Sequence, residues 1–169
     1  MIYPIVKFGN PVLEKKAAIV TVFDDELRKL TDDMFESMYA ARGVGLAAPQ
    51  IGISRRIAVI DVTFKEDPKA KLVLINPEII HTEGRFKQSE GCLSIPDFRE
   101  NVTRPRAVTV RAQDEHGKIF ELTGEELLAR ALQHETDHLN GKLYISQISA
   151  LKRDLIKRKI RKLVKAGEW

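Results

Sequence analysis

The chain of 169 residues contains a single cysteine, Cys92, so it cannot form an internal disulfide. This excludes the small secreted scaffolds held together by several disulfides, and it leaves either a buried or a reactive thiol. Long apolar runs are also absent, whereas a membrane-crossing helix needs about 20 apolar residues. The N-terminus has no basic segment followed by an apolar stretch, the pattern of a secretory signal. We therefore expect a cytoplasmic protein without a membrane span.

The formal net charge of +4 is small and unevenly distributed. Residues 151–169 hold eight basic and two acidic side chains, which gives +6, so the rest of the chain carries −2. A negatively charged partner would bind at this basic tail, although a solvated helix end without a partner is an equally good interpretation. Apolar residues recur at helical spacing in the tail, so we expect one stripe to pack on the body. The stripe comprises Leu151, Leu155, Ile156, Ile160 and Leu163.

The order of sequence patterns predicts a single α+β domain over residues 1–169. Acids at 24–26, followed by apolar residues at spacings of three and four, predict a helix of about 18 residues that ends at Gly43. Helical periodicity returns from Gly124 to about Asn140 and again from Ser149 into the tail, 151–169. Between the first two helices, short β-rich segments lie at 57–61, 71–76, 78–82, 102–113 and 118–122, with a turn at 114–117. The absence of β-α-β alternation favours antiparallel sheets packed around the second helix.

His134, Glu135 and His138 form an HExxH pattern within the second predicted helix. Residues four apart lie on one face of a helix, so both imidazoles can bind one metal ion while Glu135 reaches a water bound to it. Two ordinary surface histidines are the alternative. The apolar residues around the pattern argue against it, because they indicate that at least one imidazole faces the interior, where it needs a partner.

A metal site of this kind needs a third protein ligand. Zinc peptidases with HExxH usually take it from downstream, but no histidine follows His138 and the only later acids are Asp154 and Glu168, in the basic tail. Upstream, Cys92 follows a glycine, and a thiolate is a good ligand for Zn²⁺ or Fe²⁺. A lone cysteine is more often a small buried hydrophobic residue, so Cys92 alone does not decide the question.

A further segment, residues 43–50, follows the first predicted helix and contains two glycines and Gln50. Glycine lets backbone approach a ligand closely, and a side-chain amide can donate to a developing oxyanion. In chain order, three segments resemble the signature motifs of the peptide deformylase family, at similar intervals. They are GVGLAAPQ at 43–50, EGCLS at 90–94 and QHETDHL at 133–139. The resemblance extends over nearly the whole chain.

The resemblance implies a metal-dependent hydrolase that removes the formyl group from the N-terminal formylmethionine of new bacterial polypeptides and releases formate. It implies one divalent metal ion per chain, natively Fe²⁺, for which Zn²⁺, Ni²⁺ or Co²⁺ can substitute. The implied metal ligands are Cys92, His134 and His138.

The same resemblance assigns roles to the neighbouring residues. Glu135 is implied as the general acid/base, while the amide of Gln50 and the backbone N–H of Leu93 bind the formyl oxygen. The methionine side chain would enter an apolar pocket, and Gly45 would offer backbone hydrogen bonds to the extended peptide. The residues implied for substrate binding are Val44, Gly45, Leu93 and Ala131. Arg130 lies where we expect the family to vary, so the rim of this pocket is not defined by the resemblance.

Glu90, two residues before Cys92, is expected to need a cation, and Arg104 is a candidate partner. Two independent surface charges are an equally good interpretation of this pair.

Two other functions are compatible with parts of the sequence. An HExxH zinc endopeptidase would act on unformylated peptides, and the missing downstream ligand argues against it. A ribosome- or nucleic-acid-associated module that acts through the basic tail would bind no metal. For a deformylase, the expected partners are formylated nascent polypeptides and the ribosome near its exit tunnel, reached through the tail. We expect a monomer that does not contact membranes.

Overall fold

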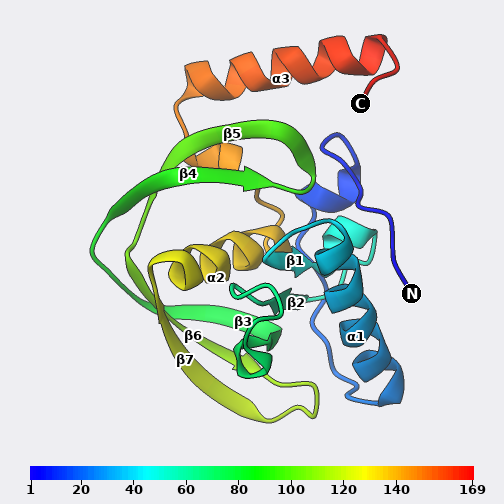
Figure 1. Cartoon of the computed structure of the whole chain (residues 1–169), viewed down its shortest axis with the longest axis vertical. Coiled ribbons are helices and arrows are strands. Elements are labelled where there is room, and N and C mark those ends of the chain that lie inside the picture. Colours follow the sequence, from blue (N-terminus) through cyan, green and yellow to red (C-terminus); the bar gives the residue numbers. More distant parts are fainter.

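The structure is a computed structural model that describes residues 1–169, and its elements have the predicted α+β character (Figure 1). The helices are α1 (Asp25–Ala40), α2 (Glu126–Leu139) and α3 (Ala150–Lys165). The strands are β1 (Gly45–Ala47), β2 (Ile57–Ile60), β3 (Leu72–Glu83), β4 (Phe86–Cys92), β5 (Ile95–Arg104), β6 (Ala107–Gln113) and β7 (Ile119–Glu125). They form an antiparallel five-stranded sheet, in the order β1-β2-β3-β6-β7, and a separate antiparallel pair, β4-β5. None of the helices combines the length and apolar character that a membrane span requires.

Helices α1 and α2 cover opposite faces of the five-stranded sheet. Successive side chains of a strand point to opposite faces, so Ile57 and Val59 of β2 pack in the core beneath α1, whereas Ala58 and Ile60 pack beneath α2. This two-sided cover explains why β2 is apolar at every position. Helix α2 lies between this sheet and the β4-β5 pair (Figure 1), so it is buried along most of its length.

The helix ends differ in part from the prediction. The Asp24 side chain caps α1 by accepting a hydrogen bond from the Leu27 amide at 3.0 Å. The helix ends before the predicted Gly43, because Arg42 takes the left-handed conformation, with φ of +60°. The predicted end of α2 is confirmed, since Gly141 follows it in the left-handed region with φ of +76°.

Several predicted strand boundaries are wrong. The segment 102–113 is not one strand: it is divided at Pro105, which has no N–H to donate to a ladder. The two parts belong to different sheets, as β5 and β6. Segments 71–76 and 78–82 instead form one strand, β3, interrupted by an irregularity where Asn76 has φ of +53°. Strands β1 and β4 were not predicted, because β1 is short and β4 is mostly polar.

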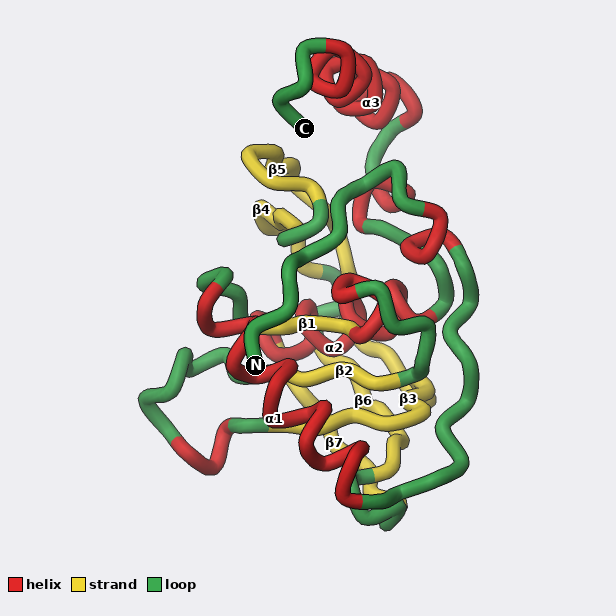
Figure 2. The backbone as a smooth tube through the Cα atoms, turned by 90° about the vertical axis from the view of Figure 1, so that its right-hand side faces the viewer, coloured by secondary structure: helices red, strands yellow, loops and turns green.

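Helix α3 packs across the outer side of the β4-β5 pair (Figure 2), through a third core cluster. Ile156 and Ile160, four residues apart, are its buried side chains. The predicted apolar stripe is therefore only partly correct. Leu151 and Leu155 are 72% and 45% exposed, because they lie about 100° or more around the helix from Ile156.

The C-terminal residue anchors this helix to the body. The Trp169 indole N–H donates to the carbonyl oxygen of Phe8 at 2.8 Å, and its ring meets Phe98 of β5 edge to face at 6.2 Å. The basic tail is thus a docked element of the fold.

Replacement of Ile160 by alanine tests this docking. Ile160 is 3% exposed, so we expect Ile160→Ala to lower the free energy of unfolding by about 2–5 kcal/mol. Leu151→Ala removes a similar volume from an exposed position, and its expected effect stays within about 0.5 kcal/mol. Urea unfolding of both variants measures the difference, and equal effects would contradict a packed α3.

Candidate active site

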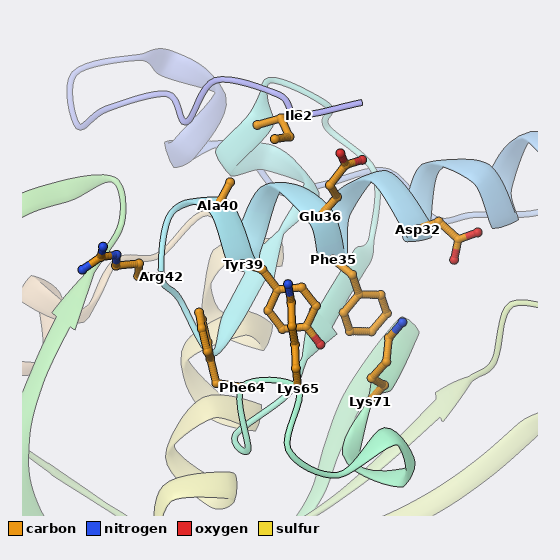
Figure 3. Close-up of a pocket in the computed structure, with 10 residues that line it drawn as sticks. All are labelled: Ile2, Asp32, Phe35, Glu36, Tyr39, Ala40, Arg42, Phe64, Lys65 and Lys71. Carbon is orange, nitrogen blue, oxygen red and sulfur yellow. The ribbon is translucent and has the colours of Figure 1, made fainter.

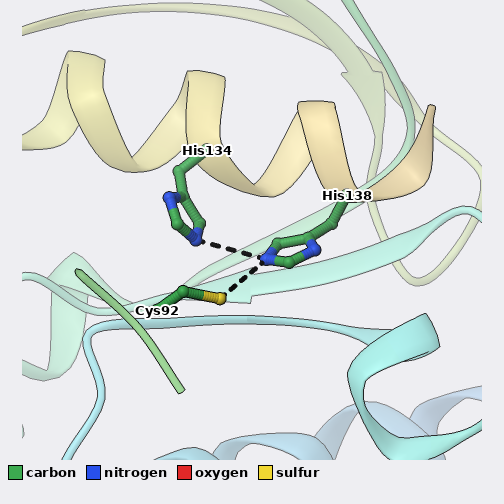
Figure 4. Close-up of side chains that lie close together, drawn as sticks. All are labelled: Cys92, His134 and His138. Carbon is green, nitrogen blue, oxygen red and sulfur yellow. Dashed lines mark hydrogen bonds between the residues drawn. The ribbon is translucent and has the colours of Figure 1, made fainter. Parts of the chain in front are cut away.

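Three side chains that can bind a metal converge beneath α2 (Figure 4). His134 and His138 project from one face of α2, and Cys92 ends β4 opposite them. The Nε2 atoms of the two histidines are 3.2 Å apart, and the Cys92 Sγ atom lies 3.3 Å from Nε2 of His138. The three ligand atoms all lie within 4.8 Å of one another. The structure therefore brings together the pair from the helix and the upstream cysteine.

The geometry of the triad fits a tetrahedral metal centre. With metal–nitrogen distances of about 2.0–2.1 Å and metal–sulfur distances of about 2.3 Å, tetrahedral ligand atoms lie roughly 3.3–3.6 Å apart. The observed separations of 3.2 and 3.3 Å are close to these values. His134 Nδ1 also lies 2.7 Å from a Glu90 carboxylate oxygen, an arrangement that turns its Nε2 toward the shared point. On a tetrahedral ion, three protein ligands would leave a fourth position for water or substrate.

Glu90 lies at the centre of a buried ionic network. Arg104 donates to both carboxylate oxygens, at 2.8 and 2.7 Å, and Arg130 donates a further hydrogen bond at 2.8 Å. Burial disfavours the charged form, but hydrogen bonds from His134 and Arg104 outweigh it and hold the pKa of Glu90 well below its usual value. Glu90 and Arg104 are therefore a buried pair and not independent surface charges. The role of Arg130 was not predicted, although a buried carboxylate this close to the cysteine signals a need for cations.

Glu135 lies beside the triad, with an oxygen available for chemistry. Its Oε1 atom is buried and has no hydrogen-bond partner. Burial raises the pKa of this carboxyl to about 7, which suits a group that both accepts and releases a proton near neutral pH. Gly45 of β1 packs directly against it, since a Cβ atom on Gly45 would lie only 2.5 Å from the carboxylate. A larger residue at this contact would displace the Glu135 carboxylate or β1.

The amide of Gln50 is held in a fixed orientation. Its Oε1 atom accepts a hydrogen bond from the Ala47 amide at 3.0 Å, so Nε2 faces the other way. That nitrogen lies 3.2 Å from the Ser94 hydroxyl and 3.6 Å from the sulfur of Cys92. A donor therefore points toward the position where substrate would meet the triad.

One cleft of about 640 Å³ contains nearly all of the predicted site residues. Those that line it are Val44, Gly45, Gln50, Cys92, Leu93, Ala131, His134 and Glu135. His138 lies behind this surface, 1% exposed. The cleft is also lined by residues that were not predicted, among them Leu127, Arg42 and Arg99. They come from three separate parts of the chain, so periodicity within one element carries no signal about a shared cavity.

A larger hollow, of about 1020 Å³, lies between α1 and the loop that follows β2 (Figure 3). Its walls include Phe35, Tyr39 and Phe64, but none of the triad. Only Arg42 lines both this hollow and the cleft. The chemistry therefore belongs to the smaller cleft.

The fold and the site together are those of a metal-dependent hydrolase. The model of the polypeptide deformylase family matches residues 2–154. A peptide deformylase of Acidobacterium capsulatum is 65% identical over 169 residues, which cover 100% of this chain and 99% of the relative. A peptide deformylase of Alkalilimnicola ehrlichii is 47% identical over 98% of this chain and 93% of the relative.

Solved structures agree with these relatives. The crystal structure of a peptide deformylase from Legionella pneumophila has a TM-score of 0.91 at 47% identity, covering 99% of this chain and 98% of that one. The peptide deformylase from Thermus thermophilus has a TM-score of 0.90 at 41% identity, covering 98% and 97% of the two chains. The chain belongs to the polypeptide deformylase family.

It is an enzyme that removes the N-terminal formyl group from nascent polypeptides, as the motifs predicted. The family is metal-dependent, and the Cys92, His134 and His138 cluster is a possible site for the ion. The endopeptidase and the non-enzymatic module are excluded as the main function by this family membership.

Replacing Glu90 by glutamine tests the ionic network. Arg130 would lose its carboxylate partner and Arg104 would keep only Asp137, so we expect a loss of about 3–5 kcal/mol in unfolding free energy. Because His134 would lose the partner that orients it, metal affinity should also fall about 10- to 100-fold. Glu121 forms an exposed ion pair with Arg111, and Glu121→Gln is the control, with an expected cost below about 1 kcal/mol. Unchanged stability and metal affinity in Glu90→Gln would refute this role.

Proposed function

We propose that Cys92, His134 and His138 hold one divalent metal ion and that Glu135 moves the proton during formamide hydrolysis. The observation that carries this proposal is the convergence of three ligand atoms beside a buried carboxylate oxygen without a partner. When bound, a divalent ion lowers the pKa of water from 15.7 to about 7 and so supplies a nucleophile at neutral pH. We propose Fe²⁺ as the native ion. Cys/His₂ ligation also suits Zn²⁺, Ni²⁺ and Co²⁺.

Glu135 serves as the general base and then as the general acid. Its carboxylate takes a proton from the attacking water and returns it to the departing amine of the peptide. Burial supports this role, because it keeps the pKa of the group close to neutrality and limits exchange with bulk water. A cation bound nearby favours the ionised form that must accept the first proton.

Gln50 and Leu93 bind the formyl oxygen. The side-chain amide of Gln50 and the backbone N–H of Leu93 donate to the negative charge that develops in the tetrahedral intermediate. The hydrogen bond between Gln50 and Ala47 fixes the amide before substrate arrives, so little reorganisation is needed. One donor of this kind contributes about 3 kcal/mol to transition-state stabilisation.

The formylated methionine lies along β1 with its side chain in an apolar pocket formed by Val44, Leu93 and Ala131. Strand β1 is an edge of the five-stranded sheet, and an extended peptide can hydrogen-bond to backbone at such an edge. Gly45 provides these backbone groups. The whole chain, 1–169, works as one deformylase domain with 151–169 as its basic tail.

The tail brings the enzyme to its substrate. The exposed basic side chains of α3 include Arg158, Lys159, Arg161 and Lys162, while Ile156 and Ile160 hold the opposite face on the body. Nascent chains leave the ribosome through a surface rich in RNA phosphate, and a basic helix face can bind it electrostatically. We place the enzyme in the cytoplasm, as a monomer docked near the exit tunnel.

Three substitutions test the chemical roles on formyl-Met peptides, with anaerobically prepared protein and formate release as the readout. Glu135→Gln should retain metal and fold while kcat falls at least about 10²-fold. Cys92→Ala should lose the metal together with activity, since two imidazoles alone are too few ligands. Gln50→Ala should lower kcat/KM by roughly 10²–10³-fold.

Unformylated peptides of the same sequence are the control, because an endopeptidase would cleave them. Metal loss in Glu135→Gln would make that residue a ligand. A Cys92→Ala protein with stoichiometric metal and normal turnover would place the third ligand elsewhere.

Ribosome binding is tested by removing positive charges from α3, because deletion of the whole helix would also remove the buried Ile160. The variant carries glutamine at Arg158, Lys159, Arg161 and Lys162. We expect it to keep peptide turnover but to lose co-sedimentation with ribosomes at low salt. The control carries glutamine at four exposed lysines on other surfaces, Lys15, Lys16, Lys87 and Lys118. Equal co-sedimentation of both variants with the unmodified protein would refute docking through α3.

A further inference from the structure

The cleft has two arginines that no carboxylate neutralises. Arg42 and Arg99 both line it, and neither forms an ion pair within the chain. The third arginine of the cleft, Arg130, differs because Glu90 accepts its hydrogen bond at 2.8 Å. Asp97 is the one exposed carboxylate in the lining, and it is likewise unpaired. The mouth of the cleft therefore carries an excess of positive charge.

Arg42 occupies a backbone position that does not suit arginine. With φ of +60° it lies in the left-handed region that glycine or asparagine usually fills after a helix. Its side chain is exposed and makes no hydrogen bond, and Figure 3 shows it extending away from α1 and from the other residues of the larger hollow. Backbone strain of this kind is often found at functional sites, so it indicates a role for the Arg42 side chain in the cleft.

Arg99 is held close to the triad. It lies on β5 opposite Gly91 of β4, and a Cβ atom on Gly91 would lie 2.9 Å from its Nη1. Nε donates to the Ser89 hydroxyl at 3.0 Å and Nη2 to the Ser89 carbonyl at 3.2 Å. Nη1 makes no hydrogen bond, so one donor of a positioned guanidinium is free beside the residue that precedes Cys92.

The path of an extended substrate passes these two side chains. Gly45 touches Glu135 and so marks where the formyl group reacts. Arg42 lies three residues before Gly45, in the turn that ends α1, so at most about 10 Å of chain separates the two residues. The two arginines line the same cleft as Gly45 and Glu135, so a peptide that leaves the site through this cleft passes them with its second or third residue.

We propose that Arg42 and Arg99 make this enzyme prefer formylated chains with Asp or Glu at the second or third residue. The preference rests on the deformylase chemistry proposed for the cleft and adds a specificity to it. Asp97 opposes the preference, because it lies in the same lining with a negative charge.

The test compares metal-loaded protein on peptide pairs that differ only in charge. The pairs are formyl-Met-Asp-Ala-Ser against formyl-Met-Asn-Ala-Ser, and formyl-Met-Ala-Asp-Ser against formyl-Met-Ala-Asn-Ser, each with a lysine counterpart. We expect kcat/KM for Asp to exceed that for Asn roughly 2- to 10-fold in at least one pair at low salt, the scale of one or two exposed ion pairs. Added salt should reduce this ratio.

Substitutions test which side chains cause the difference in kcat/KM between Asp and Asn peptides. Arg42→Asn suits the left-handed backbone and should lower the Asp/Asn ratio, while Arg42→Glu should shift the preference toward lysine. Asp97→Asn should raise the ratio. Arg85 is an exposed arginine outside the cleft, so Arg85→Gln is the control and should keep the ratio.

Three outcomes would contradict the inference. Equal kcat/KM for Asp and Asn in both pairs would overturn the inference and leave the deformylase proposal standing. A ratio unchanged in Arg42→Asn, with a lower melting temperature, would show that Arg42 only complements the end of α1, and it would also overturn the inference. Absence of formate release from every peptide would contradict the proposed function and, with it, this specificity.

Discussion

A buried, ionised Glu90 is the interaction on which the site depends. It lies on β4 and holds Arg104 of β5, Arg130 of α2 and the ring of His134. An ionised carboxylate is costly to bury, and two arginines with aligned donors offset that cost here. The same contacts tie the β4-β5 pair to the helix that carries both histidines, so Cys92 is held at a fixed distance from them. One network therefore stabilises the fold and also fixes the geometry of the Cys92, His134 and His138 cluster.

The parts of this arrangement that sequence could predict are local. The spacing of His134 and His138 fixes their common face once the segment is helical, and the turn after β6 and the end of α2 follow from their glycines. Cys92 was selected only by its motif, because composition alone favours an inert core thiol. Likewise, Gln50 alone would be interpreted as an ordinary turn residue, and only the three motifs together indicate a functional role for it.

The rest could not be predicted because it depends on contacts between distant residues. Glu90 and Arg130 are 40 positions apart, and no periodicity relates them. Pro105 shows a different limit: β-forming residues lie on both sides of it, so composition alone joins two strands that belong to different sheets. The exposure of Leu151 and Leu155 is a third case, since a helical stripe shows which residues share a face but not where that face meets the body.

The two glycines of the first motif show how steric and chemical requirements coincide. Glycine suits these positions because there is little room for a side chain, and not because the backbone must be flexible. A Cβ on Gly43 would lie 2.7 Å from the side chain of Leu93, and one on Gly45 would meet Glu135. Both contacts bring the backbone at and just before β1 against residues that line the cleft. Any side chain at Gly45 would therefore displace either β1 or the Glu135 carboxylate. The close approach of β1 to α2 thus places the backbone edge of the sheet directly beside the carboxylate that follows His134.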